Sequence, residues 1–146
     1  MKQAFDFLPG AFRNLGIDAN FTYSPSNVGT DIAGHTIPFQ ENSKEQANII
    51  LWYQDKKLEV RVAGNYRSDR AVAQDYGGIT GFEEYQASTF YLDASTSYEF
   101  APHWTVFAEG SNLTKESERY YLVWPDMRLN TTQFEPRYAI GLRAKF

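Results

Sequence analysis

The last thirteen residues of the chain alternate between two kinds of side chain. From 134 to 146 they read F-E-P-R-Y-A-I-G-L-R-A-K-F, with apolar residues at even positions and charged or small ones at odd positions. Side chains of a β-strand alternate between two faces, so this segment predicts a strand with one apolar and one polar face. A soluble sheet can contain such a strand. A membrane β-barrel requires it, because lipid lies outside the barrel and a polar lumen lies inside.

Five further segments show the same alternation and also predict strands. They are residues 15–23, 44–54, 58–67, 88–100 and 104–113. Short turns at 55–57 and 101–103 and long polar loops at 24–43, 68–87 and 114–133 separate the six strands. We therefore expect an all-β, antiparallel up-and-down meander of about six strands that forms a segment of a transmembrane β-barrel.

The loop lengths and the aromatic residues support a membrane sheet. All long loops fall at one end of the predicted meander, as in outer-membrane barrels with short periplasmic turns and long external loops. Aromatic residues make up 16% of the chain. Those near strand ends on the apolar faces match the aromatic girdles of membrane interfaces. They are Tyr23, Tyr53, Tyr66, Phe90, Tyr98, Phe100, Trp104 and Tyr138.

The composition argues against several other functions. The chain has no cysteine, and its two histidines, His35 and His103, fall at opposite ends of the predicted meander. We therefore expect no metal site and no cofactor. The net charge is −4 and no basic patch stands out, so nucleic acid is not an expected partner. No arrangement of Ser, His and Asp indicates a hydrolytic triad, and we expect no enzymatic activity.

Four motifs, taken in order, resemble the C-terminal β-barrel portion of a TonB-dependent outer-membrane receptor. They are F-L-P-G at 7–10 followed by L-G-I-D-A-N-F-T-Y at 15–23, V-A-G-N-Y-R-S at 62–68, E-G-S-N-L-T at 109–114, and Y-A-I-G-L-R-A-K-F at 138–146. The resemblance implies a barrel of about 22 strands with a plug. By that resemblance, residues 1–146 supply the last six strands and lack the plug.

The resemblance also implies a location and partners. The chain would lie in the outer membrane of a Gram-negative bacterium, in contact with outer-membrane lipid. It would belong to a receptor for active uptake of a scarce ligand, such as a siderophore, a cobalamin or an oligosaccharide. Its protein partners would be the barrel-assembly machinery and the remaining barrel and plug, with TonB reached only through the missing plug. The barrel-insertion signal would comprise Tyr138, Gly141 and Phe146, although Ala139 and Ala144 depart from the family pattern.

Ligand contacts are expected on the long loops. Aromatic faces stack on sugars or flat chelates, and charged groups fix the orientation of a ligand. The candidates are Arg67, Tyr76, Tyr120, Tyr121, Trp124, Asp126 and Arg128, with Asp69, Arg70 and Asp75 near the second loop. The alternative is that these loops only pack their own aromatic residues.

The polar faces of the strands could line a transport lumen. Alternatively, their charges could pair across neighbouring strands and serve only structure. The residues concerned are Asp18, Asn20, Glu59, Arg61, Asn65, Arg67, Asp93, Glu99, Glu109, Glu135, Arg137 and Arg143.

Two other kinds of protein remain open at this point. One is a small closed outer-membrane barrel, which needs eight strands with the first paired to the last. The other is a soluble carbohydrate-binding β-domain, which predicts that Ile49, Leu92 and Ile140 point into a buried core.

Overall fold

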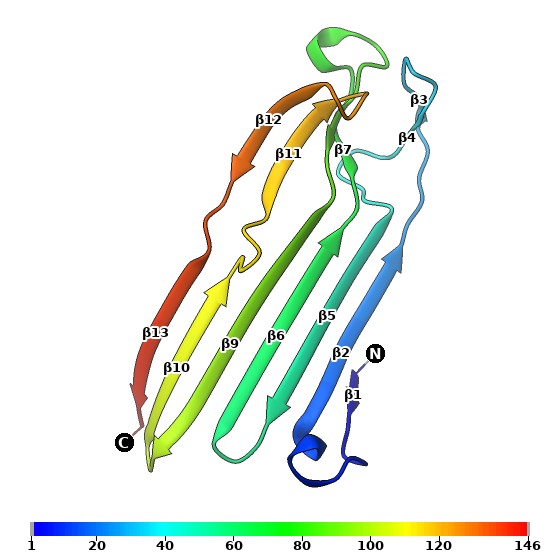
Figure 1. Ribbon diagram of the computed structural model, residues 1–146. Helices are drawn as coiled ribbons and strands as arrows, with labels where there is room; N and C mark the ends of the chain where they lie inside the picture. Colours follow the sequence, from blue (N-terminus) through cyan, green and yellow to red (C-terminus); the bar gives the residue numbers. More distant parts are fainter. Residues whose placement is uncertain (1, 146) are drawn as a thin grey trace.

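A seven-stranded antiparallel sheet, which we call the wall, dominates the computed structural model, which describes residues 2–145 (Figure 1). Its strand order is β1-β2-β5-β6-β9-β10-β13. The bounds are Lys2–Ala4 for β1, Leu15–Tyr23 for β2, Glu45–Gln54 for β5, Leu58–Arg67 for β6, Thr89–Ala101 for β9, Trp104–Ser111 for β10 and Arg137–Ala144 for β13. The predicted all-β meander is confirmed, including the pairing of the last strand with β10.

The segments 24–43, 68–87 and 114–133 were predicted as loops, and the structure places short strands within them. They contain β3 (Gly29–Thr30), β4 (Thr36–Ile37), β7 (Arg70–Ala73), β8 (Glu84–Gln86), β11 (Ser117–Leu122) and β12 (Arg128–Gln133). The four-stranded sheet β12-β11-β8-β7 has the same order as β13-β10-β9-β6, so strands of the wall resume after a short break. We call all six strands and their connections the loop layer.

The remaining regular structure consists of short helical turns. They are the 3-10 helices η1 (Gly10–Asn14) and η2 (Tyr76–Gly78). In the described part of the chain, no helix has the length and apolar character needed to cross a membrane.

The strand registers give the wall two chemically different faces. One row across six strands is Ile17, Leu51, Val62, Ala94, Gly110 and Tyr138. The neighbouring row, on the other face, is Gly16, Trp52, Arg61, Ser95, Glu109 and Ala139. We call these the apolar face and the polar face. This separation follows from the two-residue period of the sequence.

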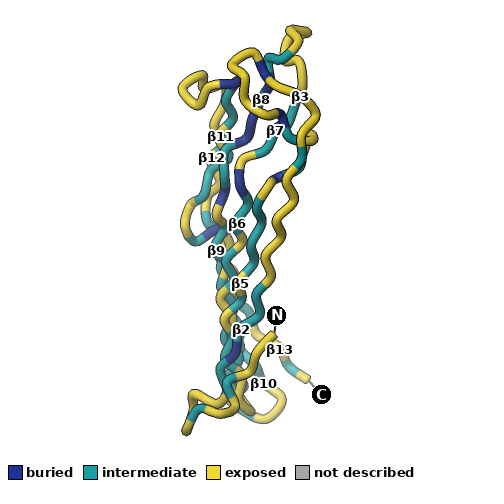
Figure 2. Tube along the Cα trace, turned by 90° about the vertical axis from the view of Figure 1, so that its right-hand side faces the viewer, coloured by how far each residue is buried: buried dark blue, intermediate teal, exposed yellow. Residues whose placement is uncertain are grey.

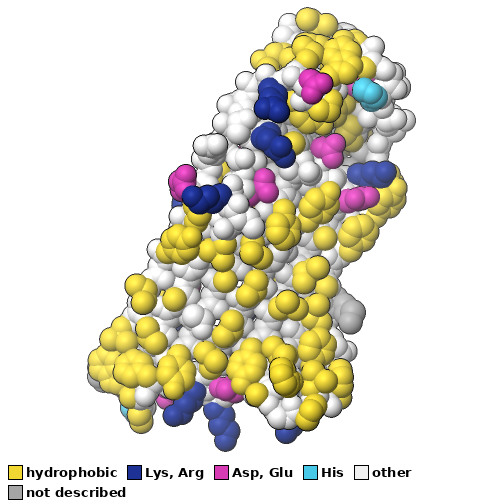
Figure 3. Space-filling model, in the orientation of Figure 1, with side chains coloured by type: hydrophobic (Ala, Val, Ile, Leu, Met, Phe, Trp, Pro, Cys, Tyr) yellow, Lys and Arg dark blue, Asp and Glu magenta, His cyan; other side chains and the backbone are white. Residues whose placement is uncertain are grey.

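The apolar face has the size of a membrane band. Phe90 and Phe100 lie near its ends on β9. Ten residue steps at about 3.3 Å each span roughly 33 Å along the strand. At the ~40° tilt of outer-membrane strands this is about 25 Å of height, the thickness of their apolar band. Charged side chains gather toward the two ends, with hydrophobic ones between them (Figure 3).

The wall is a single layer without a core of its own. Ile49 is 48% exposed and Ile140 is 81% exposed, so these side chains do not converge on a buried centre. The buried apolar residues lie in the loop layer instead, where they are Ile37, Ala71, Tyr85, Leu122 and Val123. Figure 2 shows the wall nearly edge-on, with most of the buried positions toward the loop layer. Within residues 2–145, the wall therefore lacks the buried core that a soluble β-domain requires.

Glycines on the polar face make room for large aromatic rings. Gly16 lies opposite Trp52, and a Cβ placed on Gly16 would lie 2.0 Å from Cζ2 of that ring. Gly141 lies opposite Phe107 in the same way, and a Cβ placed on Gly141 would lie 2.3 Å from Cζ of the Phe107 ring. An aromatic ring covering a cross-strand glycine is a known way to fill such a gap in a sheet.

Within residues 2–145 the wall is not closed. β1 and β13 form its two edges, and β1 covers only Gly16–Asp18 of β2. The first and last strands therefore do not pair, as they would in a closed eight-stranded barrel. Each edge exposes backbone groups that another strand could satisfy.

The two faces should tolerate charge differently. We expect Leu51→Arg to destabilise the membrane-inserted protein by about 2–4 kcal/mol, because Leu51 lies in the apolar face. Ile50→Arg, one residue away on the polar face and opposite Asp18, should have little effect. The measurement is the free energy of unfolding in lipid vesicles. Equal effects of the two substitutions would contradict a lipid-facing surface.

Candidate functional site

Two adjoining hollows follow the polar face toward the loop layer. One has a volume of about 400 Å³ and includes Arg61 and Glu109. The other has a volume of about 320 Å³ and reaches Glu118 and Phe134. Both are lined by Asp93, Ser111 and Arg137, so they form one continuous polar surface across β6, β9, β10 and β13.

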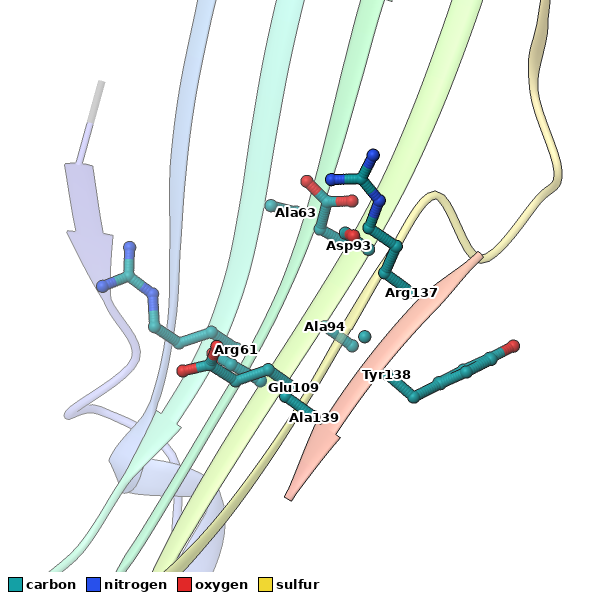
Figure 4. Close-up of a pocket in the computed structure, with 11 residues that line it drawn as sticks. Arg61, Ala63, Asp93, Ala94, Glu109, Arg137, Tyr138 and Ala139 are labelled. Atoms are coloured by element: carbon teal, nitrogen blue, oxygen red, sulfur yellow. The ribbon is translucent and has the colours of Figure 1, made fainter. Parts of the chain in front are cut away.

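Charges of both signs face the first hollow. Arg61, Asp93, Glu109 and Arg137 project on its side of the sheet, whereas Tyr138 projects away (Figure 4). In the part of the chain that the structure describes, no ion pair joins any two of these four charges. The cross-strand pairing considered from the sequence does not occur among them. Asp93 accepts a hydrogen bond from the Asn112 N–H, whereas Arg61, Glu109 and Arg137 remain available to a solute or to another polypeptide segment.

An amide ladder crosses the polar face beside this surface. The Asn48 Nδ2 donates to Asn20 Oδ1 at 2.9 Å, and Asn65 donates in turn to Asn48 Oδ1. The three side chains lie opposite one another on β2, β5 and β6. These bonds satisfy part of the polar face within the sheet itself, and they involve Asn20 and Asn65 of the expected lumen set.

Asn112 joins the wall to the loop layer. Its Nδ2 donates to the carbonyls of Glu116 (3.1 Å) and Phe134 (3.0 Å), and its Oδ1 accepts from Glu116 N–H (2.8 Å). Its own N–H donates to Asp93 Oδ1 at 2.8 Å. The φ of 53° lies in the left-handed region that Asn tolerates better than most residues. Sequence reasoning assigned Asn112 no role, although it belongs to the N-L-T motif at the end of a predicted strand.

Aromatic packing gives the loop layer its interior. Tyr85 and Tyr121 lie opposite each other on β8 and β11, with ring centroids 5.5 Å apart and an interplanar angle of 17°. The Asp69 carboxylate lies near the Tyr121 hydroxyl. Burial, together with this carboxylate, raises the pKa of Tyr121 to about 12. Tyr121 was a candidate ligand contact, and the structure places it within this packing.

Two other ligand-contact candidates, Arg67 and Tyr120, make hydrogen bonds within the protein. The Arg67 guanidinium donates to Ser43 Oγ at 2.8 Å and to the Glu41 carbonyl at 2.5 Å. Arg70 adds an ion pair with Glu41 at 2.8 Å. The Tyr120 hydroxyl donates to Glu118 Oε2 at 2.9 Å. Arg67 thus fastens the first long loop to the end of β6.

The remaining loop candidates are on exposed turns. Trp124 is 41% exposed, and the backbone bond from Met127 N–H to its carbonyl closes the turn at 2.8 Å. Asp126 and Arg128 follow on the same exposed segment. Tyr76, 39% exposed, begins η2 on a different hairpin. None of these four residues lines the polar hollows on the wall.

The expected insertion-signal residues have different environments. Tyr138 is 74% exposed on the apolar face, and Gly141 lies beneath the Phe107 ring on the polar face. Phe146 lies outside the described residues. Tyr138 could therefore contact lipid or another protein, whereas Gly141 has a local packing role.

The histidines are far apart in the fold. His35 lies in the loop layer with its Nδ1 3.1 Å from Asp31 Oδ2, and His103 lies in the turn between β9 and β10. Among the described residues, no group of three His, Cys, Asp or Glu side chains is placed to hold a metal ion.

Asn112 should be important for the loop layer. We expect Asn112→Ala to lower the free energy of local opening of the loop layer by roughly 4 kcal/mol. Three side-chain hydrogen bonds contribute about 1 kcal/mol each, and the left-handed backbone adds about 1 kcal/mol. Asn112→Gly keeps the backbone freedom and should lose only about 3 kcal/mol. Hydrogen exchange of the β11 and β12 amides measures the free energy of local opening in both variants. If Asn112→Ala lowers it no more than Asn130→Ala, a substitution at an exposed asparagine, the proposed role of Asn112 in holding the loop layer is contradicted.

The two stacked tyrosines should respond differently to loss of the hydroxyl. Tyr121→Phe should cost about 1 kcal/mol of local stability, because the Asp69 carboxylate loses a polar neighbour. Tyr85→Phe should be neutral or stabilising, because the buried Tyr85 hydroxyl has no hydrogen-bond partner. Amide exchange at pH 7 compares the variants, and the reverse order of effects would contradict this assignment.

The raised pKa values of Tyr85 and Tyr121 predict that the loop layer loses stability at alkaline pH. Burial raises the pKa of both Tyr85 and Tyr121 from 10.0 to about 12. The folded loop layer therefore holds these protons more tightly than the unfolded chain does. Their contribution to stability is complete below pH 10 and is lost as the pH rises through 12. Tyrosinate absorbance should show the transition, with a smaller amplitude in each Phe variant.

Comparison with known protein families finds a match over most of the chain. The family model described as TonB dependent receptor-like, beta-barrel, matches residues 4–113 of the 146-residue chain. No curated protein and no solved structure matches the chain. The matched residues include β2, β5, β6, β9 and β10, which form most of the wall with its apolar and polar faces. The chain therefore belongs to the TonB-dependent receptor-like β-barrel family.

Proposed function

We propose that this chain forms part of the barrel wall of an outer-membrane receptor that actively takes up a scarce ligand. Family membership supports a role in outer-membrane transport and reception. The observation that carries the proposal is the polar surface formed by the two hollows, which runs along the face opposite the apolar band. A wall between hydrocarbon and an aqueous passage needs these two faces.

The loop lengths give the wall its orientation. Short turns at one end of the strands are the periplasmic turns, and the loop layer is the external end. The apolar face then contacts outer-membrane lipid. The barrel-assembly machinery would recognise the last strand through Tyr138, Gly141 and Phe146.

The open edges support a larger assembly. Each unpaired backbone group in hydrocarbon costs several kcal/mol, so the edges at β1 and β13 need neighbouring strands. We infer that residues 1–146 belong to a larger barrel whose other strands and plug complete the receptor. TonB would act through that plug.

The ligand would first meet the exposed loop turns. Trp124 offers an aromatic face, and Asp126 and Arg128 beside it offer both signs of charge. Such a combination suits a siderophore, a cobalamin or an oligosaccharide. The bound ligand would then pass the polar hollows at Arg137, Asp93, Glu109 and Arg61. The proposal contains no covalent step and no cofactor.

Uptake by cells tests this function. The probes are labelled ferric chelates, cobalamin and malto-oligosaccharides, offered to cells that make the complete receptor. We expect energised uptake of at least one probe, lost when either the receptor or TonB is removed. Uptake that persists without TonB would contradict the proposal, and so would a receptor that takes up none of the three classes.

A variant in the loop turn tests the ligand contact. Trp124→Ala should weaken binding of the transported probe by about thirtyfold, because an aromatic residue at a binding hot spot contributes about 2 kcal/mol. Met127→Ala, in the same turn and similarly exposed at 40%, is the matched control and should bind normally. Unchanged affinity in Trp124→Ala would show that this aromatic residue is only structural.

A further inference from the structure

The tips of the three long segments meet at one place in the loop layer. The Ile32 N–H donates to the Gly81 carbonyl at 2.9 Å, which joins the first segment to the second. The Val123 N–H donates to the Glu83 carbonyl at 3.0 Å, which joins the third segment to the second. The β3–β4 hairpin and η2 both lie at this end of the molecule, opposite the short turns (Figure 1). We call these four residues the junction.

A carboxyl group is almost completely buried at the junction. Glu83 is 2% exposed, and its buried Oε2 has no hydrogen-bond partner. An ionised carboxylate in such a place loses its hydration without a compensating partner, so burial favours the neutral, protonated form. Glu83 is therefore a group at which the junction can bind a proton.

Two further carboxylates act on Glu83, and their own oxygens have partners. The Asp31 side chain is 0% exposed, and its Oδ1 accepts hydrogen bonds from two backbone N–H groups of its own turn, at 2.9 and 2.8 Å. Asp75 Oδ1 accepts a hydrogen bond from the Gly81 N–H at 2.8 Å. Their negative charges add to the cost of ionising Glu83.

The protonation of Glu83 is linked to the stability of the tips. Burial raises the pKa of Glu83 above its ordinary value of 4.5, and the charges of Asp75 and Asp31 raise this pKa further, against an opposing effect of the Asp75 N–H. The folded tips therefore bind this proton more tightly than the unfolded chain does. The resulting stability is complete below pH 4.5 and is lost as the pH rises through the raised pKa of Glu83.

Other titratable groups surround this cluster. Burial raises the pKa of Tyr85 and Tyr121 to about 12, so both hydroxyls are neutral at acidic and neutral pH, and Asp69 lies beside them. His35 Nδ1 lies 3.1 Å from Asp31 Oδ2, and the His35 side chain is 59% exposed. A protonated His35 would also favour the closed tips in acid, so its contribution has to be measured separately.

We propose that Glu83 is the proton-binding group of a latch, which holds the tips of the loop layer together in acid and releases them as the pH rises. With Glu83 protonated, the hydrogen bonds of the Ile32 and Val123 N–H groups persist. The ionised side chain repels Asp31 of the first segment and needs water, so the tips separate. The inference goes beyond the proposed function and does not depend on uptake.

Amide hydrogen exchange tests the latch in the complete receptor in lipid vesicles, from about pH 4 to about pH 8. The reporters are the Ile32 and Val123 amides, and the amides of β10 in the wall serve as the reference. Protection is expressed relative to intrinsic exchange at each pH. Glu83→Gln removes the titrating group at nearly constant size. Glu84→Gln, at the next and only half-buried residue, is the matched control.

In the parent protein, protection of both reporters should fall about fivefold or more as the pH rises, the effect of one buried polar group without a partner. Glu83→Gln should keep the reporters protected at every pH, whereas Glu84→Gln should follow the parent. His35→Asn keeps a donor for Asp31 without the change of charge, and it should also follow the parent. A fall of the parent's size in Glu83→Gln, or loss of the fall in His35→Asn, would overturn the latch.

A second variant keeps the test decisive if Glu83→Gln leaves the tips open at every pH. Asp75→Asn retains an oxygen for the Gly81 N–H and removes one charge that acts on Glu83. We expect a smaller fall in protection than in the parent, and an unchanged fall would overturn the proposed cluster. Exchange is measured without ligand and without TonB, so failure of the proposed uptake would leave these results unaffected.

Discussion

Hydrocarbon forms no hydrogen bonds with a polypeptide backbone, and the architecture of this chain follows from that constraint. The strands of the wall satisfy one another through an antiparallel ladder, so the sheet needs no second layer for its backbone. The side chains are then free to differ between the faces. This explains how a sheet can place Ile140 at 81% exposure on one side and Glu109 on the other without forming a conventional core.

The wall was predictable because its signal is local. A two-residue period identifies a strand from consecutive residues, and the short turns between β5 and β6 and between β9 and β10 make these strands neighbours. The structure confirmed those strands and the pairing of β10 with β13. The loop layer was missed because its strands are short and its pairing partners are distant in sequence. The pairing of β8 with β11, for example, joins Tyr85 to Tyr121 across the whole of β9 and β10.

The candidate site was only partly predictable for a related reason. Arg61, Asp93, Glu109 and Arg137 were expected on one face, and the register brings them to the same hollow. Composition could not reveal which loop aromatics face solvent. Tyr121 and Trp124 are three positions apart, yet one stacks inside the loop layer and the other is 41% exposed. That difference depends on Tyr85, which belongs to another hairpin.

The shared strand order of the wall and the loop layer has a mechanical consequence. The strands β6, β9, β10 and β13 continue into the loop layer as β7, β8, β11 and β12, respectively. This part of the external end of the wall therefore consists of hydrogen-bonded strands and not of flexible loops. Unless its ladder breaks, this four-stranded part of the rim can move only as a unit. In the proposed receptor, independent motion of single loops is therefore disfavoured at this part of the rim.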